Sequence, residues 1–542
     1  MARRTAKVAV IGSGLAGLTA AYELARHYEA EDGIEFEVHL FEKTESIGMD
    51  SASVSLRTQS KERDWRIDVP MRSFQGGYYP RLIDLYKRIG VSFLEADFTY
   101  SFSRLAYKNT GGRQITASSI YNGASGRRGI GMPSTLRKIY AQRKDHSSSL
   151  LLAARVTSLW LFAVMTLRLV VCYLRLLLHS VPVFRDPRLP GMTFSQWAEE
   201  TTPHTLLARC LGLDTMWKQF VTDILMPLFS AICTASKDDI IDHPAEEMLD
   251  YIWLTFGTHH YLVRNGVTDV VARLTAPLRH IHLSTPIASI NYDPQNPTLA
   301  SITCISAGGP KVFRGFDHIV FATQAPRAIP LLETYTSSLP EASPVETPAA
   351  QLIQCLKKFR YIPSIVINHT DDTLLPDDVR DRRELNLIDT DGHLSNARPQ
   401  INCVPSSYTM ATQIVRQPSW YALGPVVFQT TNPVVPPREE TIISVSRLER
   451  AVLTMASKTA LVDLYTEERQ WWQCPGQGIG KLGRLQGATT VDHGEGVGMW
   501  FCGSYVYGAI PLLEGCVVSA QLVVEGIRKR ERDSAGVSRK LE

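Results

Sequence analysis

Three glycines close to the N-terminus constrain the fold of this chain more than any other feature. The apolar run Lys7 to Ile11 is typical of a short buried strand, and Gly12-Ser-Gly14-Leu-Ala-Gly17 follows it directly. The alanine-rich stretch Leu18 to His27 then predicts a helix with Ala21 and Leu24 on one face. A strand, a glycine turn and a helix in this order predict a Rossmann-type unit that binds a dinucleotide.

Each glycine has its own role in such a turn. Gly12 permits the tight bend, Gly14 lets the backbone approach a pyrophosphate, and Gly17 lets the helix pack closely on the strand. A second strand, Phe36 to Phe41, ends at Glu42, a carboxylate placed to accept hydrogen bonds from a ribose. At this end of the chain we expect the cofactor-binding residues to be Gly12, Ser13, Gly14, Leu15, Ala16, Gly17, Glu42 and Lys43.

Composition excludes several classes of protein. The 542 residues, 44% of them hydrophobic, provide enough apolar material for more than one packed domain. Lys plus Arg is 57 and Asp plus Glu is 54, a net charge of +3, so we expect no nucleic-acid partner. The nine cysteines are scattered without a C-x-x-C pair, and we expect neither a metal site nor a disulfide framework.

A second strand, glycine turn and helix lies near the C-terminus. Met499 to Cys502 is typical of a strand, Gly503 ends it, and Gly515 lies at the start of a helical pattern that runs to about Arg528. This arrangement resembles the C-terminal flavin motif of the FAD-dependent amine oxidase and phytoene desaturase superfamily. The resemblance implies that Gly503, Ser504 and Gly515 approach the ribityl chain and the flavin ring, and it favours FAD over a nicotinamide cofactor.

The middle of the chain adds to the resemblance. Ile281 to Ile290 and Phe316 to Thr323 look like that superfamily's adenine-side strand and the strand that returns to the flavin, which implies cofactor contacts at Ile287 and Thr323. Further segments resemble, in family order, the NAD/FAD-binding oxidoreductases grouped with amine oxidases: 67–82, 225–227, 243–245, 367–371, 431–433 and 501–505. The chain departs from the pattern at Met49, where a second glycine is usual after Gly48, and at Ser504, where an acidic residue is common.

The resemblance implies a fold class and a domain organisation. The fold is α/β, with a Rossmann-type FAD-binding domain assembled from discontinuous segments and an inserted α+β substrate domain. Residues 1–100, 280–330 and 486–530 are expected to form the FAD domain. Residues 101–279 and 331–485 are expected to form the substrate domain, and 531–542 a flexible tail.

The segment Leu150 to Leu178 is long and apolar enough to cross a membrane. A single crossing is incompatible with the expected fold, because the glycine turns before and after the segment would then lie on opposite sides of the bilayer. Arg155, Arg168 and Arg175 interrupt the segment, and the last two share a helical face, which favours an interfacial helix with its arginines at the headgroups. The alternative is a buried helix of the substrate domain with its arginines paired.

These features give an expected location. The basic residues upstream of the segment are Arg127, Arg128, Arg137, Lys138, Arg143 and Lys144. We expect contact with a membrane surface through 150–178, on the cytoplasmic face, and the alternative is a soluble cytoplasmic protein. The oligomeric state is left open by the sequence.

In a flavoenzyme the isoalloxazine supplies the redox step, so a catalytic triad is not required. Met71 and Arg72 follow a strand that, by the resemblance, passes beside the flavin. Arg72 either holds charge near the ring or pairs with a carboxylate, and both remain open. We expect the neighbouring His259 and His260 to be a packed or solvated pair rather than a base or a metal site.

Three functions fit these patterns. The first is an FAD-dependent oxidoreductase that desaturates, oxidises or isomerises a lipophilic small molecule by hydride transfer to flavin, in lipid or secondary metabolism. The second is an amine oxidase, against which Leu512 stands where such enzymes carry an aromatic-cage tyrosine, although Tyr505 or Tyr507 could rebuild the cage. The third is a non-catalytic lipid or prenyl carrier of the same fold, which has no need of two intact glycine turns. FAD is expected to bind non-covalently, since no attachment motif is present.

Overall fold

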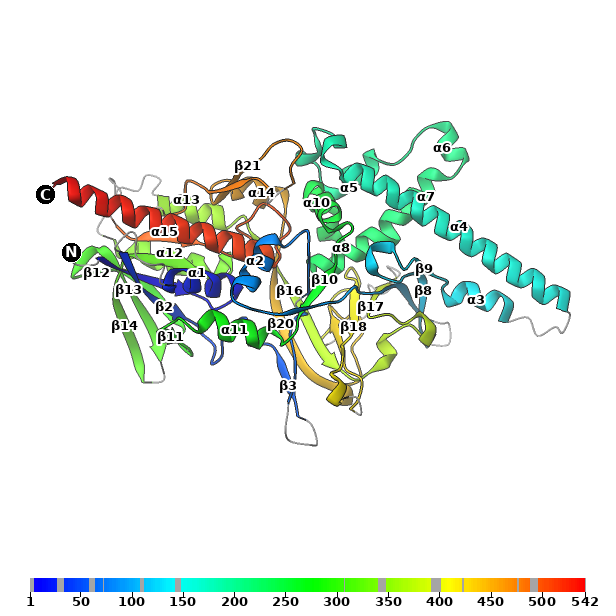
Figure 1. Cartoon of the computed structure of the whole chain (residues 1–542), viewed down its shortest axis with the longest axis horizontal. Helices are drawn as coiled ribbons and strands as arrows, with labels where there is room; N and C mark the ends of the chain where they lie inside the picture. Colours follow the sequence, from blue (N-terminus) through cyan, green and yellow to red (C-terminus); the bar gives the residue numbers. More distant parts are fainter. Residues whose placement is uncertain are drawn as a thin grey trace.

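The computed structural model describes residues 4–26, 34–57, 64–71, 73–107, 112–141, 148–306, 308–339, 348–390, 401–421, 424–474, 477–487 and 496–541. The molecule is elongated (Figure 1). A parallel sheet and both chain termini lie at one end, and the long helix α4 (Ser148–Ser180) extends from the other.

The parallel sheet is assembled from segments far apart in the sequence. Its strands follow the order β11-β2-β1-β15-β23, and every neighbouring pair is parallel. The helices α1 (Leu15–Ala25) and α15 (Leu513–Leu541) lie side by side over the sheet (Figure 1). The five strands are β1 (Arg4–Ile11), β2 (Ile34–Phe41), β11 (His280–His282), β15 (His318–Phe321) and β23 (Gly498–Phe501). This is the mixed α/β, Rossmann-like architecture that the glycine turn predicts.

The segment expected to be one strand from Ile281 to Ile290 is two strands in different sheets. β11 belongs to the parallel sheet, whereas β12 (Ile287–Asp293) starts an antiparallel meander with β13 (Asn296–Ser306) and β14 (Gly309–Phe316). Between them Ser284 adopts a positive φ of 49°, and Pro286 lacks the N–H that a ladder needs. The chain therefore turns out of the first sheet before it enters the second.

A larger, eight-stranded sheet lies beside the parallel sheet. Its order is β20-β16-β19-β18-β17-β7-β8-β9, and all neighbouring pairs are antiparallel except β17 with β7. Three of its strands precede the helical region in sequence and five follow it. The strands are β7 (Tyr100–Tyr107), β8 (Arg113–Tyr121), β9 (Ile130–Gly131), β16 (Arg360–His369), β17 (Leu385–Thr390), β18 (Met410–Ile414), β19 (Phe428–Thr431) and β20 (Ile442–Val452).

A helical region covers one face of this sheet. It consists of α3 (Ser134–Ala141), α4, α5 (Phe194–Glu200), α6 (Leu206–Cys210), α7 (Leu213–Phe220), the π-helical turn η4 (Val221–Leu225), α8 (Met226–Cys233), α9 (Lys237–Ile241) and α10 (Ala245–Thr255). Smaller elements complete the fold: β3 (Val54–Leu56), β4 (Trp65–Ile67), α2 (Pro80–Arg88), α12 (Ala325–Ser338), α13 (Pro348–Leu356), α14 (Met455–Leu461), β21 (Tyr465–Glu468) and β22 (Ile479–Leu482).

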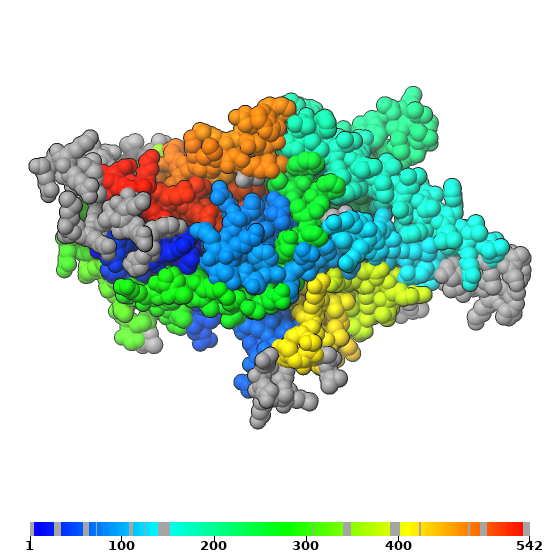
Figure 2. Space-filling view, in the orientation of Figure 1, coloured from blue at the N-terminus to red at the C-terminus, as the bar shows by residue number. Residues whose placement is uncertain are grey.

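Most of α4 is exposed. Only 11% of its most apolar 18-residue window is buried, and in Figure 2 the helix projects from the body of the molecule. Its later half is anchored by Cys172 and Leu176, each 1% exposed, and contacts α7 and α10. The alternative of a buried helix is therefore wrong for most of its length.

The three arginines of α4 have different surroundings. Arg155 and Arg168 are exposed, as expected for an interfacial helix. Arg175 is half-buried instead: it donates a hydrogen bond of 2.6 Å to the Thr201 carbonyl oxygen and its guanidinium lies 5.3 Å from the Trp217 ring. Arg175 thus anchors the helix to the protein and does not reach headgroups.

The expected boundary at residue 280 lies too late in the chain. The short strand β10 (His260–Val263) pairs with β5 (Ser73–Gln75) on one side and β6 (Phe93–Glu95) on the other, both from the first hundred residues. The next helix, α11 (Val267–Thr275), packs against α1. Residues from about 260 onward therefore belong with the dinucleotide-binding part.

The C-terminal residues 531–541 were expected to form a flexible tail, but they continue α15. Glu531 is buried, and its Oε1 lies 3.1 Å from His318 Nε2 in the parallel sheet. Arg530 donates to the carbonyl oxygens of Gly487 and Gly496, at 3.0 and 2.6 Å. Because Arg, Lys and Glu are also good helix formers, these contacts extend the helix where charge alone predicts a loose end.

Candidate functional site

The three glycines of the first turn meet different surroundings. Gly12 has a φ of +100°, and a Cβ there would lie 2.7 Å from the Ala322 carbonyl oxygen. A Cβ at Gly17 would overlap the Gly12 carbonyl oxygen, whereas a Cβ at Gly14 would meet nothing within 4 Å. The protein itself requires glycine at 12 and 17. At Gly14 the space is open, and Gly14 is the N-cap of α1 without a side-chain cap, so a phosphate has room to approach the helix N-terminus.

Glu42 is held in place by four hydrogen bonds. Its Oε2 accepts from the N–H and the Oγ of Ser13, at 3.1 and 2.6 Å, and its Oε1 accepts from the N–H and the Oγ1 of Thr44, at 3.0 and 2.9 Å. Burial acts to raise the pKa of this carboxyl, but the bonds from Ser13 and Thr44 outweigh it, and the pKa lies below its usual value. Glu42 is therefore an ionised acceptor at the end of β2, and a ribose hydroxyl would bind it by replacing the side-chain hydroxyl of Ser13 or Thr44.

Gly48 packs against Ser13 and Glu42. Its N–H donates to Ser13 Oγ at 2.7 Å, and a Cβ there would lie 2.8 Å from Glu42 Oε2. Met49, which replaces the usual second glycine, is buried and donates its N–H to the Ser13 carbonyl oxygen at 3.0 Å. The backbone of Met49 therefore helps to hold Ser13 in place beside Glu42.

The C-terminal turn is tightly packed. A Cβ at Gly515 would lie 2.9 Å from the Ser504 carbonyl oxygen. Ser519 joins the turn to α15, since its Oγ accepts from the Gly503 N–H at 2.9 Å and donates to the Gly515 carbonyl oxygen at 2.6 Å. Ser504 itself lines a large cavity.

The buried Glu514 ties this turn to α2. It accepts hydrogen bonds of 2.9 Å from the N–H groups of Arg81 and Leu82, in the first turn of α2. Burial raises the pKa of Glu514 to about 7 despite these bonds.

The other residues expected at the cofactor are dispersed. The methyl carbon of Thr323 is 3.2 Å from a Cβ placed at Gly12, and its buried Oγ1 has no partner among the described residues, which suits a ligand group beside the glycine turn. Leu15 and Met71 line the cavity, and Ala16 is buried. Lys43 is exposed and Ile287 is half-buried at the start of β12. Arg72 lies outside the described residues.

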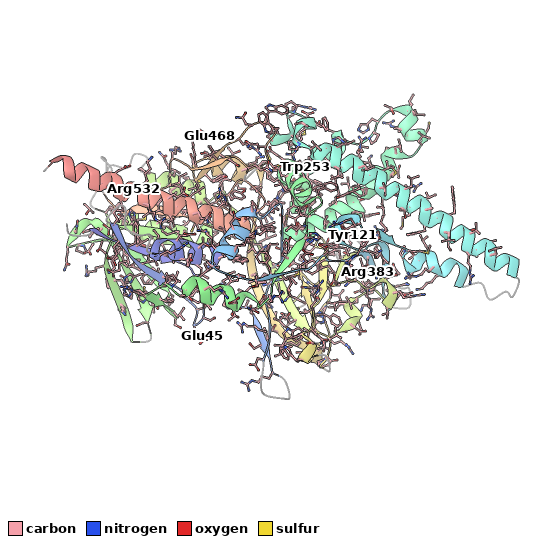
Figure 3. The ribbon with its side chains drawn as sticks, in the orientation of Figure 1. Glu45, Tyr121, Trp253, Arg383, Glu468 and Arg532 are labelled. Atoms are coloured by element: carbon pink, nitrogen blue, oxygen red, sulfur yellow. The ribbon has the colours of Figure 1, made fainter. Side chains whose placement is uncertain are left out.

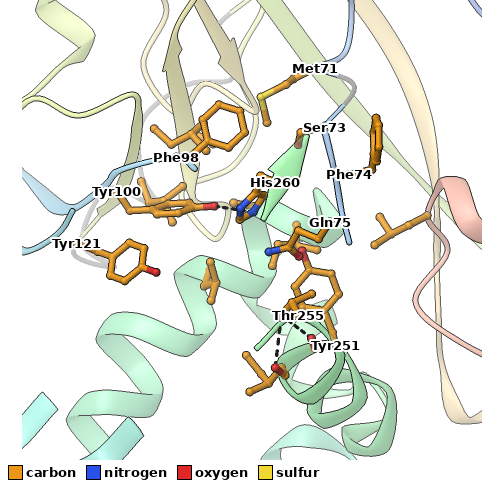
Figure 4. Close-up of a pocket in the computed structure, with 18 of the residues that line it drawn as sticks. Met71, Ser73, Phe74, Gln75, Phe98, Tyr100, Tyr121, Tyr251, Thr255 and His260 are labelled. Atoms are coloured by element: carbon orange, nitrogen blue, oxygen red, sulfur yellow. Dashed lines mark hydrogen bonds between the residues drawn. The ribbon is translucent and has the colours of Figure 1, made fainter. Parts of the chain in front are cut away.

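One cavity of about 970 Å³ connects the glycine turn with α4. Its floor is the eight-stranded sheet and its roof is formed by α4, η4, α8 and α10. Gly14, Gly48 and Met71 lie at the dinucleotide-binding end, and Val170 and Tyr173 of α4 lie at the other. Figure 4 shows the middle of this cavity, whose walls are mainly aromatic and aliphatic.

Few charged groups reach the cavity. Among its described lining residues there is no Asp, Glu or Lys, and the cationic or titratable nitrogen groups are Arg127, His260 and Arg450. His260 Nε2 lies 3.5 Å from the hydroxyl of Tyr100, and the two side chains point toward each other (Figure 4). Burial lowers the pKa of His260 to about 4, so its imidazole is neutral near pH 7.

Sequence reasoning missed His260 as a residue of the site. It was expected to be packed or solvated, and it instead lines the cavity from the short strand β10. Its partner Tyr100 lies 160 positions earlier, in β7, so no local pattern marks the pair.

The alternative in which Tyr505 or Tyr507 rebuilds an aromatic cage is not supported by the described lining of the cavity. Leu512 lines the cavity, as expected. Tyr505 packs against Phe359 with ring centroids 5.1 Å apart, and Tyr507 against Tyr465 at 5.4 Å, and neither belongs to the described lining of the cavity. The tyrosines that do line it are Tyr79, Tyr100, Tyr121, Tyr173 and Tyr251.

A histidine cluster lies on the parallel sheet, away from the cavity. Glu37, His39 and His280 bring possible ligand atoms within 4.8 Å of one another. However, the rings of His39 and His280 stack at 4.4 Å with planes only 9° apart, and parallel rings cannot both aim an in-plane lone pair at one ion. His39 also bonds Glu37 at 2.7 Å and His282 at 3.0 Å, which makes the cluster a hydrogen-bonded ladder across β2 and β11.

A comparison with known proteins finds a match in the region of the first glycine turn. The family model described as an NAD(P)-binding Rossmann-like domain matches residues 10–89. This match covers the first glycine turn, α1 and β2 of the parallel sheet. No curated protein matches the sequence.

Three solved structures align over nearly the whole chain, all from a structure-based redesign of cofactor binding in putrescine oxidase. A double mutant has a TM-score of 0.47 and 11% identity and covers 97% of this chain and 100% of its own. The wild type bound to putrescine has a TM-score of 0.46 and 12% identity, with 97% and 99% covered. A single mutant has a TM-score of 0.43 and 12% identity, with 97% and 100% covered. Likeness at this level identifies neither the activity nor the substrate of this chain.

Proposed function

We propose that this protein is an FAD-dependent oxidoreductase that acts on a lipophilic small molecule, with FAD bound non-covalently. The observation that carries the proposal is one continuous cavity that runs from the Gly14 turn to the apolar helix α4. A cofactor on the glycine turn and a substrate from the α4 end would meet inside it.

The residues of the dinucleotide-binding end fit the cofactor. The open space at Gly14 suits the pyrophosphate, ionised Glu42 suits the ribose, and the unpartnered Thr323 hydroxyl suits a polar group beside them. Ser504 and Leu512 line the same cavity from the C-terminal turn, where the flavin would lie. The flavin would supply the hydride acceptor, while this chain orients the substrate and excludes water.

The walls of the cavity favour a lipophilic substrate over an amine. An ammonium group in this cavity would lose its hydration without gaining a carboxylate partner, because the described lining contains no Asp or Glu. Desaturation, oxidation or isomerisation of a hydrocarbon chain needs no such partner. That chemistry would suit a role in lipid or secondary metabolism.

We further propose that α4 rests on a membrane surface, on the cytoplasmic side. Of the described helices, α4 from Leu152 to Ser180 is the one whose length and composition would allow a crossing. β1 and β23 share one sheet although they precede and follow α4, so a crossing would divide the sheet. Its large exposed apolar residues are Leu152, Val156, Leu159, Trp160, Leu161, Leu167, Val170, Val171, Tyr173, Leu174 and Leu178. Such a surface fits the acyl boundary of a bilayer.

The test is the visible spectrum of the purified protein. We expect flavin absorbance, release of the yellow cofactor on heat denaturation, and bleaching under nitrogen with a lipophilic substrate but not with simple amines or polyamines. A colourless protein that still binds lipids would be a carrier. Rapid bleaching by amines at micromolar concentration would establish the amine oxidase instead.

A further inference from the structure

The cavity reaches solvent beside α4. Val170, Tyr173 and Leu174 of α4 line the cavity and are also 44%, 39% and 55% exposed. Phe256, just after α10, lines it too and is 48% exposed. Residues that both line a cavity and meet solvent mark its opening. The opening therefore adjoins the apolar surface proposed to contact the membrane.

Arg127 lies at this opening. It is exposed and lines the cavity, and it follows the short helical turn η1 (Ala124–Gly126). Tyr121, at the end of β8, lies toward the α4 end of the molecule (Figure 3), and its hydroxyl accepts a 2.7 Å hydrogen bond from the Gly126 N–H. The turn that carries Arg127 is thus tied to the end of the sheet.

The guanidinium of Arg127 is positioned by a chain of hydrogen bonds. Its Nε donates to the Ala124 carbonyl oxygen at 3.1 Å, and its Nη2 lies 3.4 Å from His259 Nε2. The other ring nitrogen of His259, Nδ1, lies 2.9 Å from Asp97 Oδ2. When Nδ1 of His259 carries the proton and donates a hydrogen bond to Asp97, Nε2 of His259 is unprotonated and accepts a hydrogen bond from Arg127. A guanidinium has five N–H donors, and these two contacts leave three for a ligand.

We propose that Arg127 binds the carboxylate of an amphipathic acid whose hydrocarbon tail occupies the cavity. The inference rests on the proposed function, and it names the class of lipophilic substrate. Arginine forms two parallel hydrogen bonds with a carboxylate, and the apolar walls behind it accept the tail.

The orientation follows from the cost of burying charge. A second arginine, Arg450, also lines the cavity, from β20, which forms the opposite edge of the sheet from β8 and β9. A carboxylate that travelled to Arg450 would leave water and cross the apolar interior. A carboxylate that stays at Arg127 remains hydrated, and the hydrocarbon tail of the acid then extends to the dinucleotide-binding end of the cavity.

The experiment compares oleate with its methyl ester, both below the concentrations at which they aggregate, by quenching of intrinsic fluorescence in the full-length protein. For Arg127→Leu we expect the affinity for oleate to fall about threefold to fivefold, since a solvent-exposed ion pair contributes up to about 1 kcal/mol, and the affinity for methyl oleate to stay unchanged. Arg128→Leu is the matched control, because the adjacent Arg128 is exposed but does not line the cavity. It should leave both affinities unchanged.

Two other outcomes would overturn the proposal. Unchanged oleate affinity in Arg127→Leu, with weaker binding to vesicles of anionic phospholipid, would mean that Arg127 contacts headgroups. Loss of oleate binding in Arg450→Leu but not in Arg127→Leu would reverse the orientation. Flavin absorbance of the same samples tests the proposed function separately: a colourless protein that binds oleate through Arg127 would refute the enzyme and retain this site.

Discussion

Gly14 and Gly17 lie three positions apart in one turn, yet a side chain at each has a different effect. For Gly14→Val we expect a folded protein that has lost its flavin. The new side chain would enter open space, and a φ of −68° with a ψ of 177° is accessible to valine. Its cost to stability should stay near 1 kcal/mol, the range of N-cap substitutions. Flavin content per mole of protein and thermal unfolding measure the two effects separately.

Gly17→Val is the comparison for that variant. Its Cβ would overlap the Gly12 carbonyl oxygen, so the helix and the strand must separate and the protein should fail to fold. A Gly14→Val protein with a full complement of flavin would show that the phosphates bind elsewhere.

Glu42 allows a prediction about the cofactor-free protein. Both of its oxygens accept from backbone N–H groups, those of Ser13 and Thr44. In Glu42→Gln the amide NH₂ must face one of these donors, and we expect a loss of about 1–3 kcal/mol in unfolding free energy, the cost of an unsatisfied buried polar group. Denaturant unfolding of the flavin-free variant measures it. Equal stability of variant and wild type would mean that the carboxylate serves the ligand alone.

Sequence reasoning works well for residues whose partners are local. Gly12, Gly14 and Gly17 act within one turn, so their spacing was sufficient to predict it. His260 and Arg127 were not predicted as site residues. Tyr100 in β7 and Asp97 in the loop before β7 help to position them, and only the tertiary fold brings these residues near.

At the scale of elements, α4 allows a prediction about the membrane. Leu159 and Trp160 are 60% and 68% exposed, so replacing both with Gln should change unfolding free energy by no more than about 0.5 kcal/mol. Binding to vesicles should weaken at least about tenfold, because two large side chains no longer enter the acyl boundary. Vesicle co-sedimentation provides the measurement.

The control for α4 lies on its buried side. Leu176→Gln, at a position 1% exposed, should destabilise the fold by about 2–5 kcal/mol. If the Leu159 and Trp160 variant bound vesicles as tightly as wild type, the membrane would contact another surface.

Element boundaries show where sequence patterns stop being informative. The apolar run predicted α4 within two residues at each end, because hydropathy persists along it. The end of α15 was mispredicted, since it depends on contacts of Arg530 with the loop residues Gly487 and Gly496 and of Glu531 with β15. The split between β11 and β12 depends on which sheet each joins, and sequence alone does not encode that plainly.

At the scale of the whole molecule, buried histidines predict how stability depends on pH. Burial lowers the pKa of His243, His260, His282 and His369 to about 4 each. Between pH 4 and the unfolded value near 6.5, the unfolded chain binds more protons than the folded one at these sites. They therefore favour the unfolded state as the pH falls through this range.

The carboxyls whose pKa is raised by burial act in the opposite direction, and they are Glu247, Asp250, Asp389 and Glu514. Burial raises the pKa of Glu247 and Glu514 to about 7, so the folded protein retains their protons where the unfolded chain releases them, and they lower stability as the pH rises from about 4.5 to 7. Burial also lowers the pKa of His39 and His179, so among the described residues six histidines outnumber these four carboxyls. We expect the melting temperature to fall between pH 6.5 and 4.5, which differential scanning calorimetry would detect, and a constant value would contradict the balance of these groups.

The parallel sheet also fixes an order of events during synthesis. β1 is made first, but its neighbour β15 and the outer strand β23 come from the later part of the chain, and α15, which covers α1, comes last. The cofactor site therefore cannot close until translation is nearly complete. By then α4 has already left the ribosome, so the growing chain exposes the apolar side chains of α4 before its dinucleotide-binding end is assembled.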